Sequence, residues 1–315
     1  VATVHEGQQA IVLLNRRGFS TFVLCRDCGE TLTCPHCAVS LVYHADENRM
    51  RCHYCGNVYP IPTVCPSCGS KRIKFFGSGT QKAEAEISQM PGVNVLRMDQ
   101  DSTAGKLAHE TILRRFAAKE ANVLLGTQMV AKGHDIANVT LVGILASDST
   151  LNLPDFRASE RGFALLTQAA GRAGRGEEPG TVVLQTYDPE NPVIRLAARQ
   201  DYDTFAQREL TLRKDLFYPP YSEILKLTVV DKEEEKAWEL ADRLADFLRE
   251  IIPQMPEKTE VMGPFPAGVA KVRDLYRMSV VVKSAAMEKV KEQLLQSEFK
   301  TMKNIYFDVD PVNSI

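Results

Sequence analysis

The sequence predicts an α/β protein that carries an inserted metal-binding module and is followed by a smaller α+β domain. Short strands rich in Val, Ile and Leu alternate with helices up to residue 187, which is typical of a mostly parallel sheet. All eight cysteines lie between residues 25 and 68. After residue 217 the expected order becomes strand, helix, strand, strand, helix, strand, the split βαβ order of ferredoxin-like domains.

Composition excludes some classes of protein. Of the 315 residues, 44% are hydrophobic and 25% charged, as expected for an ordinary globular protein with two or three domains. No apolar run approaches the ~20 residues of a membrane span and no secretory signal is apparent, so we expect a cytoplasmic protein without a membrane partner. The formal net charge is −2, so nucleic-acid binding would have to come from local basic patches.

The α/β part is expected to begin before the cysteines and to resume after them. Apolar runs at 10–15 and 21–24 predict strands joined by a turn at 16–18. The expected elements that follow are helix 81–90, strand 93–98, helix 106–119, strand 122–126, strand 139–146, helix 158–171 and strand 181–187. The cysteine region is therefore an insertion in the α/β domain.

A polar helical bridge is expected at 191–216, where the prolines of the segment 217–221 end it. The expected elements beyond it are strand 223–230, helix 232–252, strands 261–264 and 277–283, helix 287–298 and strand 304–309. The predicted domains are the α/β domain at 1–24 and 72–217, the inserted module at 25–71 and the C-terminal α+β domain at 218–315.

The cysteines form four C-x-x-C pairs, which we call knuckles, at 25/28, 34/37, 52/55 and 65/68. Two such pairs supply the four thiolates that a structural zinc ion takes in tetrahedral geometry, so four pairs predict two zinc ions. Disulfides are less favoured, because C-x-x-C pairs in a chain without a signal peptide indicate metal binding. His36, His44 and His53 could replace a cysteine, but eight thiolates already fill two sites.

Spacing favours a nested pairing of the knuckles. Five residues separate Cys28 from Cys34, which leaves little room to fold one knuckle onto the other, whereas fourteen separate Cys37 from Cys52. The expected sites are an inner one of Cys34, Cys37, Cys52 and Cys55, and an outer one of Cys25, Cys28, Cys65 and Cys68. Sequential and crossed pairings remain open alternatives.

Residues 168–175 (QAAGRAGR) form a second informative stretch. On a helix Gln168, Arg172 and Arg175 would share one face, and the small residues between them would let another surface approach closely. Two arginines presented together suit a triphosphate, because their planar donor forks are always charged. The alternative is a helix end with solvated arginines and glycine caps.

Two loops of the α/β domain could contact a ligand. The loop 126–135 follows a buried strand and offers polar groups where open α/β sheets bind ligands, namely Thr127, Gln128, Lys132, Gly133 and Asp135. A plain turn capped by Thr127 is the alternative. The glycine-rich segment 77–80, with Gly79 and Thr80, precedes a helix and could hold a phosphate, although simple capping by Thr80 explains it as well.

In the C-terminal domain, basic side chains surround an aromatic one. Lys271, Arg273 and Arg277 lie near Tyr276, a combination that suits phosphate contact together with stacking on a base or sugar. A solvated strand edge explains the composition equally well.

Several stretches together resemble a known family. Residues 168–175 resemble the Q-x-x-G-R-x-x-R motif of the second motor lobe of superfamily 2 helicases, and 126–135 resembles motif V of that RecA-like lobe. With the segments 14–18, 154–157, 160–161 and 308–311 and the inserted cysteines, essentially the whole chain resembles the bacterial replication-restart helicases of the PriA (primosomal protein N′) family.

The resemblance implies an ATP-driven 3′-to-5′ DNA helicase that recognises stalled forks and restarts replication by primosome assembly. It implies arginine fingers at Arg172 and Arg175 beside Gln168, further nucleotide contacts at Gly133 and Asp135, and nested zinc pairing. The implied DNA contacts are Gly79, Thr80, Thr127, Gln128, Lys132, Lys271, Arg273, Tyr276 and Arg277. The implied partners are forked and single-stranded DNA, single-strand-binding protein and primosome and helicase-loading proteins, for a monomer associated with the nucleoid.

The chain departs from a complete family member, because it has no G-x-x-x-x-G-K-[ST] loop and no D-E-x-[HD] box. It also opens on Val1 rather than Met, so we expect a fragment that hydrolyses no ATP alone and would use ATP with Mg²⁺ only in the full-length protein. The alternative function is a non-enzymatic zinc-ribbon adaptor that binds nucleic acid or protein. The paired arginines at 172 and 175 argue against an adaptor.

Overall fold

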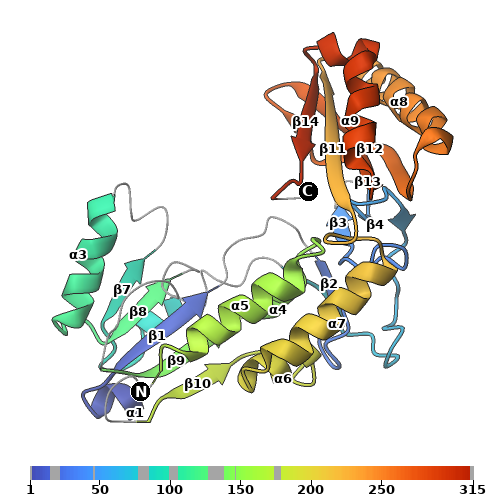
Figure 1. Ribbon diagram of the computed structural model, residues 1–315. Helices are drawn as coiled ribbons and strands as arrows, with labels where there is room; N and C mark the ends of the chain where they lie inside the picture. The colour runs from blue at the N-terminus through green and yellow to red at the C-terminus, as the bar shows by residue number, and fades with distance from the viewer. Residues whose placement is uncertain are drawn as a thin grey trace. The chain divides into compact units, whose positions relative to one another are not determined.

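The computed structural model describes residues 2–14, 22–44, 47–76, 85–98, 106–126, 138–145, 147–173 and 179–312. The chain forms two compact units, coloured along the chain in Figure 1. The first unit comprises Val1–Thr31, Thr63–Leu153 and Arg157–Phe205. The second unit comprises Leu32–Pro62, Pro154–Phe156 and Ala206–Ile315.

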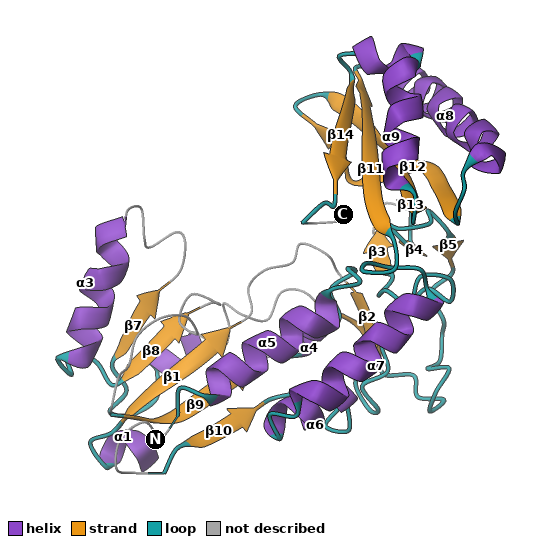
Figure 2. Cartoon of the chain, in the orientation of Figure 1, coloured by secondary structure: helices purple, strands orange, loops and turns teal. Residues whose placement is uncertain are grey.

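The first unit contains a five-stranded sheet in the order β10-β9-β1-β8-β7, in which every paired strand is parallel. Figure 2 shows these strands side by side. The strands are β1 (Gln9–Leu14), β7 (Val95–Met98), β8 (Val123–Gly126), β9 (Val139–Leu145) and β10 (Thr181–Leu184). The helices of this unit are α1 (Ala2–His5), α3 (Lys106–Ala117), α4 (Asp148–Leu151), α5 (Ala158–Ala170) and α6 (Pro192–Ala198). The parallel sheet predicted from the sequence is therefore present.

The core of the first unit lies between this sheet and helix α5. Strand β8 is buried along its whole length, as expected for a strand covered on both faces. Helix α5 directs Phe163, Leu166 and Ala169 into the core, where they join the sheet residues Leu124 and Val142. The spacing of these helix residues places them on one face, which is why α5 packs on the sheet. Residues 85–88 are also helical, within the predicted helix 81–90.

The predicted helical bridge at 191–216 is two helices, α6 and α7 (Tyr202–Asp215). Asn191 caps α6 by accepting a hydrogen bond from the N–H of Val193. Gln200 then takes a left-handed backbone conformation with φ of 54°, which ends the helical path. Asp201 accepts a bond from the N–H of Thr204 and so starts α7. Residues of α7 belong to both units.

The second unit contains a four-stranded antiparallel sheet in the order β12-β13-β11-β14. Its elements are β11 (Glu223–Asp231), α8 (Glu234–Ile251), η1 (Ile252–Gln254), β12 (Thr259–Val272), β13 (Leu275–Ser284), α9 (Met287–Gln296), η2 (Glu298–Thr301) and β14 (Ile305–Val309). The predicted order of strand, helix, strand, strand, helix, strand is confirmed. Helices α8 and α9 pack on one face of this sheet, where the core contains Leu227, Val280 and Leu244.

The hairpin of β12 and β13 is longer than the sequence predicts. The expected strands 261–264 and 277–283 extend to 259–272 and 275–284. Arg273 and Asp274, the two residues between the strands, both have positive φ, of 50° and 60°. A two-residue turn of this kind matches the twist of the strands it joins, and it allows the pairing to continue to the tip.

Five short strands accompany the cysteines. In the first unit β2 (Phe22–Cys25) pairs antiparallel with β6 (Ile73–Phe76). In the second unit β3 (Val42–His44), β4 (Arg49–Arg51) and β5 (Val58–Tyr59) form an antiparallel meander. Among the described residues, no helix is both long and apolar enough to cross a membrane.

Candidate functional site

The four knuckles share one backbone geometry. In each, the N–H of the residue after the second cysteine donates to the carbonyl oxygen of the first cysteine, at 2.8 to 3.0 Å. That following residue has a positive φ of 50° to 77°, and the residues are Gly29, Ala38, Gly56 and Gly69. Glycine adopts this conformation without steric cost, which explains three of the four residues. The repeated turn directs the two thiols of each knuckle to the same side.

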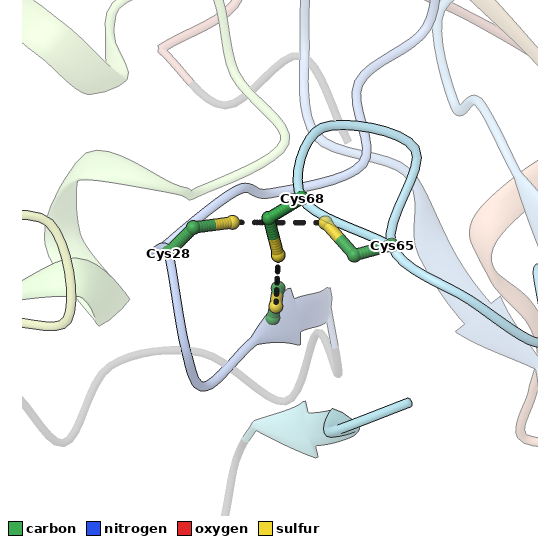
Figure 3. Close-up of side chains that lie close together, drawn as sticks. Cys28, Cys65 and Cys68 are labelled. Carbon is green, nitrogen blue, oxygen red and sulfur yellow. Dashed lines mark hydrogen bonds between the residues drawn. The ribbon is translucent and has the colours of Figure 1, made fainter. Parts of the chain in front are cut away.

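The outer cluster contains Cys25, Cys28, Cys65 and Cys68, and Figure 3 shows the last three labelled. The Sγ atoms of Cys25 and Cys68 are 3.7 Å apart, and those of Cys28 and Cys65 are 3.6 Å apart. Cys68 is exposed and Cys28 is half-buried. All four ligands lie in the first unit, so this cluster belongs to the α/β lobe.

The inner cluster contains Cys34, Cys37, Cys52 and Cys55, of which the first three are buried. The Sγ atoms of Cys34 and Cys55 are 3.7 Å apart. The N–H of Tyr54 donates to the Sγ of Cys52 at 3.4 Å, and the Oη of Tyr59 lies 3.6 Å from the Sγ of Cys34. Such bonds offset part of the cost of burying thiolate charge.

Both clusters fit a zinc ion. In a tetrahedral ZnS₄ centre with Zn–S bonds of about 2.3 Å, neighbouring sulfurs lie about 3.8 Å apart. The observed Sγ separations of 3.6 and 3.7 Å match this value, whereas a disulfide would bring two sulfurs to about 2.05 Å. All eight cysteines are free thiols, and within each cluster the four Sγ atoms lie within 4.8 Å of one another. The nested grouping that spacing favours is the one the fold brings together.

Mutual repulsion would prevent the thiols of one cluster from ionising together without a cation. Burial opposes ionisation of Cys25, but bonds from the N–H groups of Asp27 and Cys28 and from the Cys68 thiol lower its pKa to about 7. In the inner cluster, bonds with Cys37, Cys52 and Cys55 lower the pKa of Cys34, and the bond with Cys34 raises the pKa of Cys37. A divalent cation removes this conflict, because metal coordination stabilises every thiolate at once.

The inner cluster packs against the C-terminal sheet of its own unit. Tyr218 donates a hydrogen bond from its Oη to the carbonyl oxygen of Cys37, 3.2 Å away. The ring of Tyr218 meets that of Tyr54 edge-on, with centroids 5.9 Å apart. At Gly56 an added Cβ would lie 2.8 Å from the Cβ of Phe265 in β12, closer than folded proteins allow. The second inner knuckle therefore lies directly on the sheet.

Four side chains form a stack beside this contact. The rings of Phe156 and Tyr218 are parallel, 4.7 Å apart with an interplanar angle of 4°. The guanidinium of Arg213 lies 5.2 Å from the Phe156 centroid, and the Nζ of Lys283 lies 3.9 Å from the Tyr218 centroid. Each ring thus presents one face to the other ring and one to a cation, an arrangement that aromatic quadrupoles favour. The N–H of Phe156 also donates to the Oη of Tyr54.

The outer cluster packs against a loop of the α/β lobe. At Gly29 an added Cβ would lie 2.5 Å from the Cβ of Asp188 and 2.8 Å from the carbonyl oxygen of Tyr187. The buried carboxylate of Asp148, at the start of α4, holds this loop by accepting from the Oγ1 of Thr186 and from the N–H of Tyr187. Burial raises the pKa of Asp148.

His36, His44 and His53, which could have replaced a cysteine, lie outside both clusters. His53 and His44 face each other, with their Nε2 atoms 3.2 Å apart. Burial, followed by the charges of His44, Arg51 and Lys226, lowers the pKa of His53 to about 3, so this side chain is neutral near pH 7.

The arginine-finger stretch differs from the helical arrangement expected from the sequence. Helix α5 ends at Ala170 with Gly171 as its C-cap, so Gln168 lies on the helix but Arg172 lies in the turn beyond it. The N–H of Arg172 donates to the carbonyl oxygen of Ala169, which closes that turn. Gln168 and Arg172 therefore do not share one helix face, because α5 ends before Arg172.

Several predicted site residues lie outside the described residues. These are Gly79, Thr80, Thr127, Gln128, Lys132, Gly133, Asp135 and Arg175. The C-terminal group is described. Lys271 and Arg273 are exposed at the tip of the β12–β13 hairpin, and Tyr276 and Arg277 are half-buried. The Nζ of Lys271 lies 4.6 Å from the Tyr276 ring centroid and 3.8 Å from a carboxylate oxygen of Asp274.

Sequence reasoning missed Tyr218 and Lys283. The sequence indicates only the end of a helix at the aromatic and proline segment 217–221, although Tyr218 is 2% exposed in the fold. It places Lys283 in a strand and indicates no role for this side chain. A lone lysine at the end of the apolar run SVVVKS was the available signal, because buried lysines occur almost only with a partner.

Comparison with known proteins identifies three parts of the chain. Residues 68–177 match the Helicase conserved C-terminal domain, residues 34–60 match the PriA DNA helicase Cys-rich region (CRR) domain, and residues 214–312 match the Primosomal protein N C-terminal domain. The fold and the cysteine clusters therefore define the class: a helicase C-terminal lobe with an inserted zinc module and a further C-terminal domain.

Curated relatives narrow this class to a family. The chain is 44% identical to replication restart protein PriA of Bacillus subtilis over 98% of this chain and 39% of the relative. The identity is 43% with that of Synechocystis sp. (96% and 37%) and 38% with that of Treponema pallidum (99% and 48%). The chain belongs to the PriA replication-restart family, and it spans less than half the length of these relatives.

Proposed function

We propose that the chain supplies the second motor lobe, the zinc module and the C-terminal domain of an ATP-dependent 3′-to-5′ DNA helicase that restarts replication at stalled forks. The observation that carries this proposal is the match of residues 68–177 to a helicase C-terminal domain, within a unit that contains a five-stranded parallel sheet. Two four-cysteine clusters are inserted in the sequence between strands β1 and β7 of that sheet. The name of the relatives, replication restart protein, supports the role in restart.

Arg172 and Arg175 act as arginine fingers in this proposal, and Gln168 is a third catalytic residue. In the complete protein another lobe would hold ATP with Mg²⁺, and Gly133 and Asp135 would contact the nucleotide from this side. Guanidinium groups stabilise the charge that develops on the transferred phosphoryl group. Because this chain has no phosphate-binding loop of its own, the fragment alone is expected to hydrolyse no ATP.

The test is Arg172→Ala in the full-length protein, with Arg114→Ala as the control. Arg114 is 77% exposed on α3 and pairs only with Glu110 on the same helix among the contacts described. We expect Arg172→Ala to slow DNA-stimulated ATP turnover by about a thousandfold while DNA binding persists, and Arg114→Ala to change neither. Loss of DNA binding with intact hydrolysis would assign Arg172 to DNA instead.

We propose that the tip of the β12–β13 hairpin contacts DNA through Lys271, Arg273, Tyr276 and Arg277. The tip projects exposed cations beside an aromatic ring, which suits a phosphate together with a stacked base. Single-stranded DNA binding should weaken in Lys271→Ala, and the salt dependence of log K should become shallower by about 0.7. Lys289→Ala is the control, because Lys289 is 59% exposed on α9. Equal salt slopes for Lys271→Ala and the native chain would contradict this contact.

In the same proposal, the remaining contacts with the DNA backbone are made by Gly79, Thr80, Thr127, Gln128 and Lys132. The partners would be forked and single-stranded DNA, single-strand-binding protein and primosome and helicase-loading proteins, and the protein would act as a monomer on nucleoid DNA in the cytoplasm. Two zinc ions would fill the clusters, so elemental analysis should find two per chain.

The domain description is also a proposal. The α+β domain at 218–315 would be ferredoxin-like, supported by its element order and its strand order β12-β13-β11-β14. The helicase lobe would comprise 1–24 and 72–217, with the zinc module at 25–71.

A further inference from the structure

Lys283 is a buried lysine whose only described ion pair is long. Its side chain is 4% exposed, and its Nζ donates to the carbonyl oxygen of Leu216 at 3.0 Å. The nearest carboxylate oxygen, on Glu260, lies 4.0 Å away, beyond hydrogen-bond distance. The Nζ of Lys283 also lies 3.9 Å from the ring centroid of Tyr218. An ammonium group this buried is costly unless other negative charge compensates it.

The inner cysteine cluster can supply that charge. Four thiolates and one Zn²⁺ carry a net charge of −2, and three of the four cysteines are buried. Tyr218 contacts both groups, because it donates its hydroxyl to the Cys37 carbonyl and offers one face of its ring to the Lys283 ammonium. The buried cation and the buried anion thus share Tyr218 as a neighbour.

We propose that the C-terminal domain completes the inner zinc site, with Lys283 as the charge partner of the zinc–thiolate centre and Tyr218 as the residue that positions both. This inference rests on the proposed zinc occupancy. Both residues are positioning residues, since neither is a metal ligand.

Charge favours the zinc-bound state at this site. When zinc binds, the thiols release their protons and the cluster changes from near neutral to −2. A fixed positive charge nearby therefore strengthens zinc binding. By linkage, bound zinc stabilises the contact between the inner knuckles and the sheet by the same factor. The outer site has no corresponding buried lysine among the described residues. Arg72, in the same unit, pairs with Asp27 at the surface.

The test compares Lys283→Met with Lys258→Met in the full chain loaded with zinc. Lys258 also lies over an aromatic ring, 4.4 Å from the Phe217 centroid, but it is 57% exposed. Cysteines are alkylated with N-ethylmaleimide in the presence of EDTA, and mass spectrometry of the knuckle peptides follows each cluster separately. We expect the inner cysteines of Lys283→Met to react at least about tenfold faster than in the native chain. The outer cysteines, and both clusters of Lys258→Met, should react at the native rate.

Two further variants protect the test from a folding defect. Lys283→Arg keeps the charge and should restore most of the protection. Tyr218→Phe keeps the ring but loses the bond to the Cys37 carbonyl, and it should speed reaction of the inner cysteines by about fivefold. If Lys283→Met fails to fold, these two variants decide the outcome.

The inference is overturned if the inner cysteines of Lys283→Met react at the native rate. If Lys283→Met does not fold, a native rate in Tyr218→Phe overturns it instead. Faster reaction of both clusters in equal measure overturns it as well, because it indicates general unfolding. If the native chain holds two zinc ions and these substitutions have no effect, only the role of Lys283 is rejected. If the native chain holds no zinc, the proposed zinc occupancy itself is rejected.

Discussion

The outer and inner cysteine clusters are built from the same knuckle, yet they lie in different surroundings. Both bring four thiols to the separations of a tetrahedral zinc site. The outer cluster leaves Cys68 exposed and packs on a loop of the α/β lobe. The inner cluster is buried against the C-terminal sheet, with Tyr218 and Phe265 in contact. The motif therefore determines the metal geometry, whereas residues distant in sequence determine which unit each site stabilises.

The largest expected difference between the sites follows from removing one ligand of each. Cys37→Ser and Cys68→Ser should each reduce the zinc content to one ion per chain. Only Cys37→Ser should also speed amide hydrogen exchange in β11 and β13, because an inner knuckle packs on that sheet at Phe265 and its loss should cost several kcal/mol. Native exchange in both strands of Cys37→Ser would contradict the contact between the inner site and the C-terminal domain.

Phe156→Ala should lower the free energy of unfolding of the second unit by about 3 to 5 kcal/mol, because it removes a buried ring from the stack with Tyr218. Phe307→Ala is the control, since Phe307 on β14 is 43% exposed. Urea denaturation followed by tyrosine fluorescence measures both variants. Equal losses in the two would mean that the stack contributes nothing specific.

The pH dependence of the second unit should include His53. Its pKa falls from 6.5 to about 3 in the fold, so the neutral form is favoured. This stability is fully present above pH 6.5 and is lost as the pH falls towards 3, at up to about 1.4 kcal/mol per pH unit. Between pH 6.5 and 5 the native chain should lose about 2 kcal/mol more than His53→Gln does. Parallel stability curves for the two chains would show that His53 is not buried neutral.

The smallest expected effect compares two glycines with nearly equal φ. Gly56→Ala and Gly69→Ala impose the same backbone strain, since φ is 76° and 72°, but an added Cβ meets Phe265 only at Gly56. Both should destabilise the chain by about 1 kcal/mol, and Gly56→Ala by a further 1 to 2 kcal/mol. Thermal unfolding measures the difference. Indistinguishable variants would place the second inner knuckle away from the sheet.

Local chemistry made much of this fold predictable. The knuckles depend on spacing within a few residues, and the alternation of apolar strands and helices depends on short periodic patterns. The order of elements in the C-terminal domain was therefore correct. The end of α5 agrees with the predicted helix 158–171 to within one residue, but Arg172 lies in the turn after it and not on the helix face of Gln168.

The long-range contacts could not be predicted from the sequence. Tyr218 reaches Cys37 across 181 residues, and no local pattern specifies which tyrosine meets which knuckle. The sequence also predicts the cysteine region as a single inserted module, whereas its inner and outer clusters pack within different units. Only the folded chain shows which surface each cluster covers.

The order in which the two clusters lose zinc tests most directly that the inner site is built into the C-terminal domain and the outer site is not. The native chain is exposed to EDTA and N-ethylmaleimide, and mass spectrometry times the alkylation of each knuckle peptide. The account predicts that Cys25, Cys28, Cys65 and Cys68 react well before Cys34, Cys37, Cys52 and Cys55. Reaction of the inner four first, or of all eight together, would contradict it.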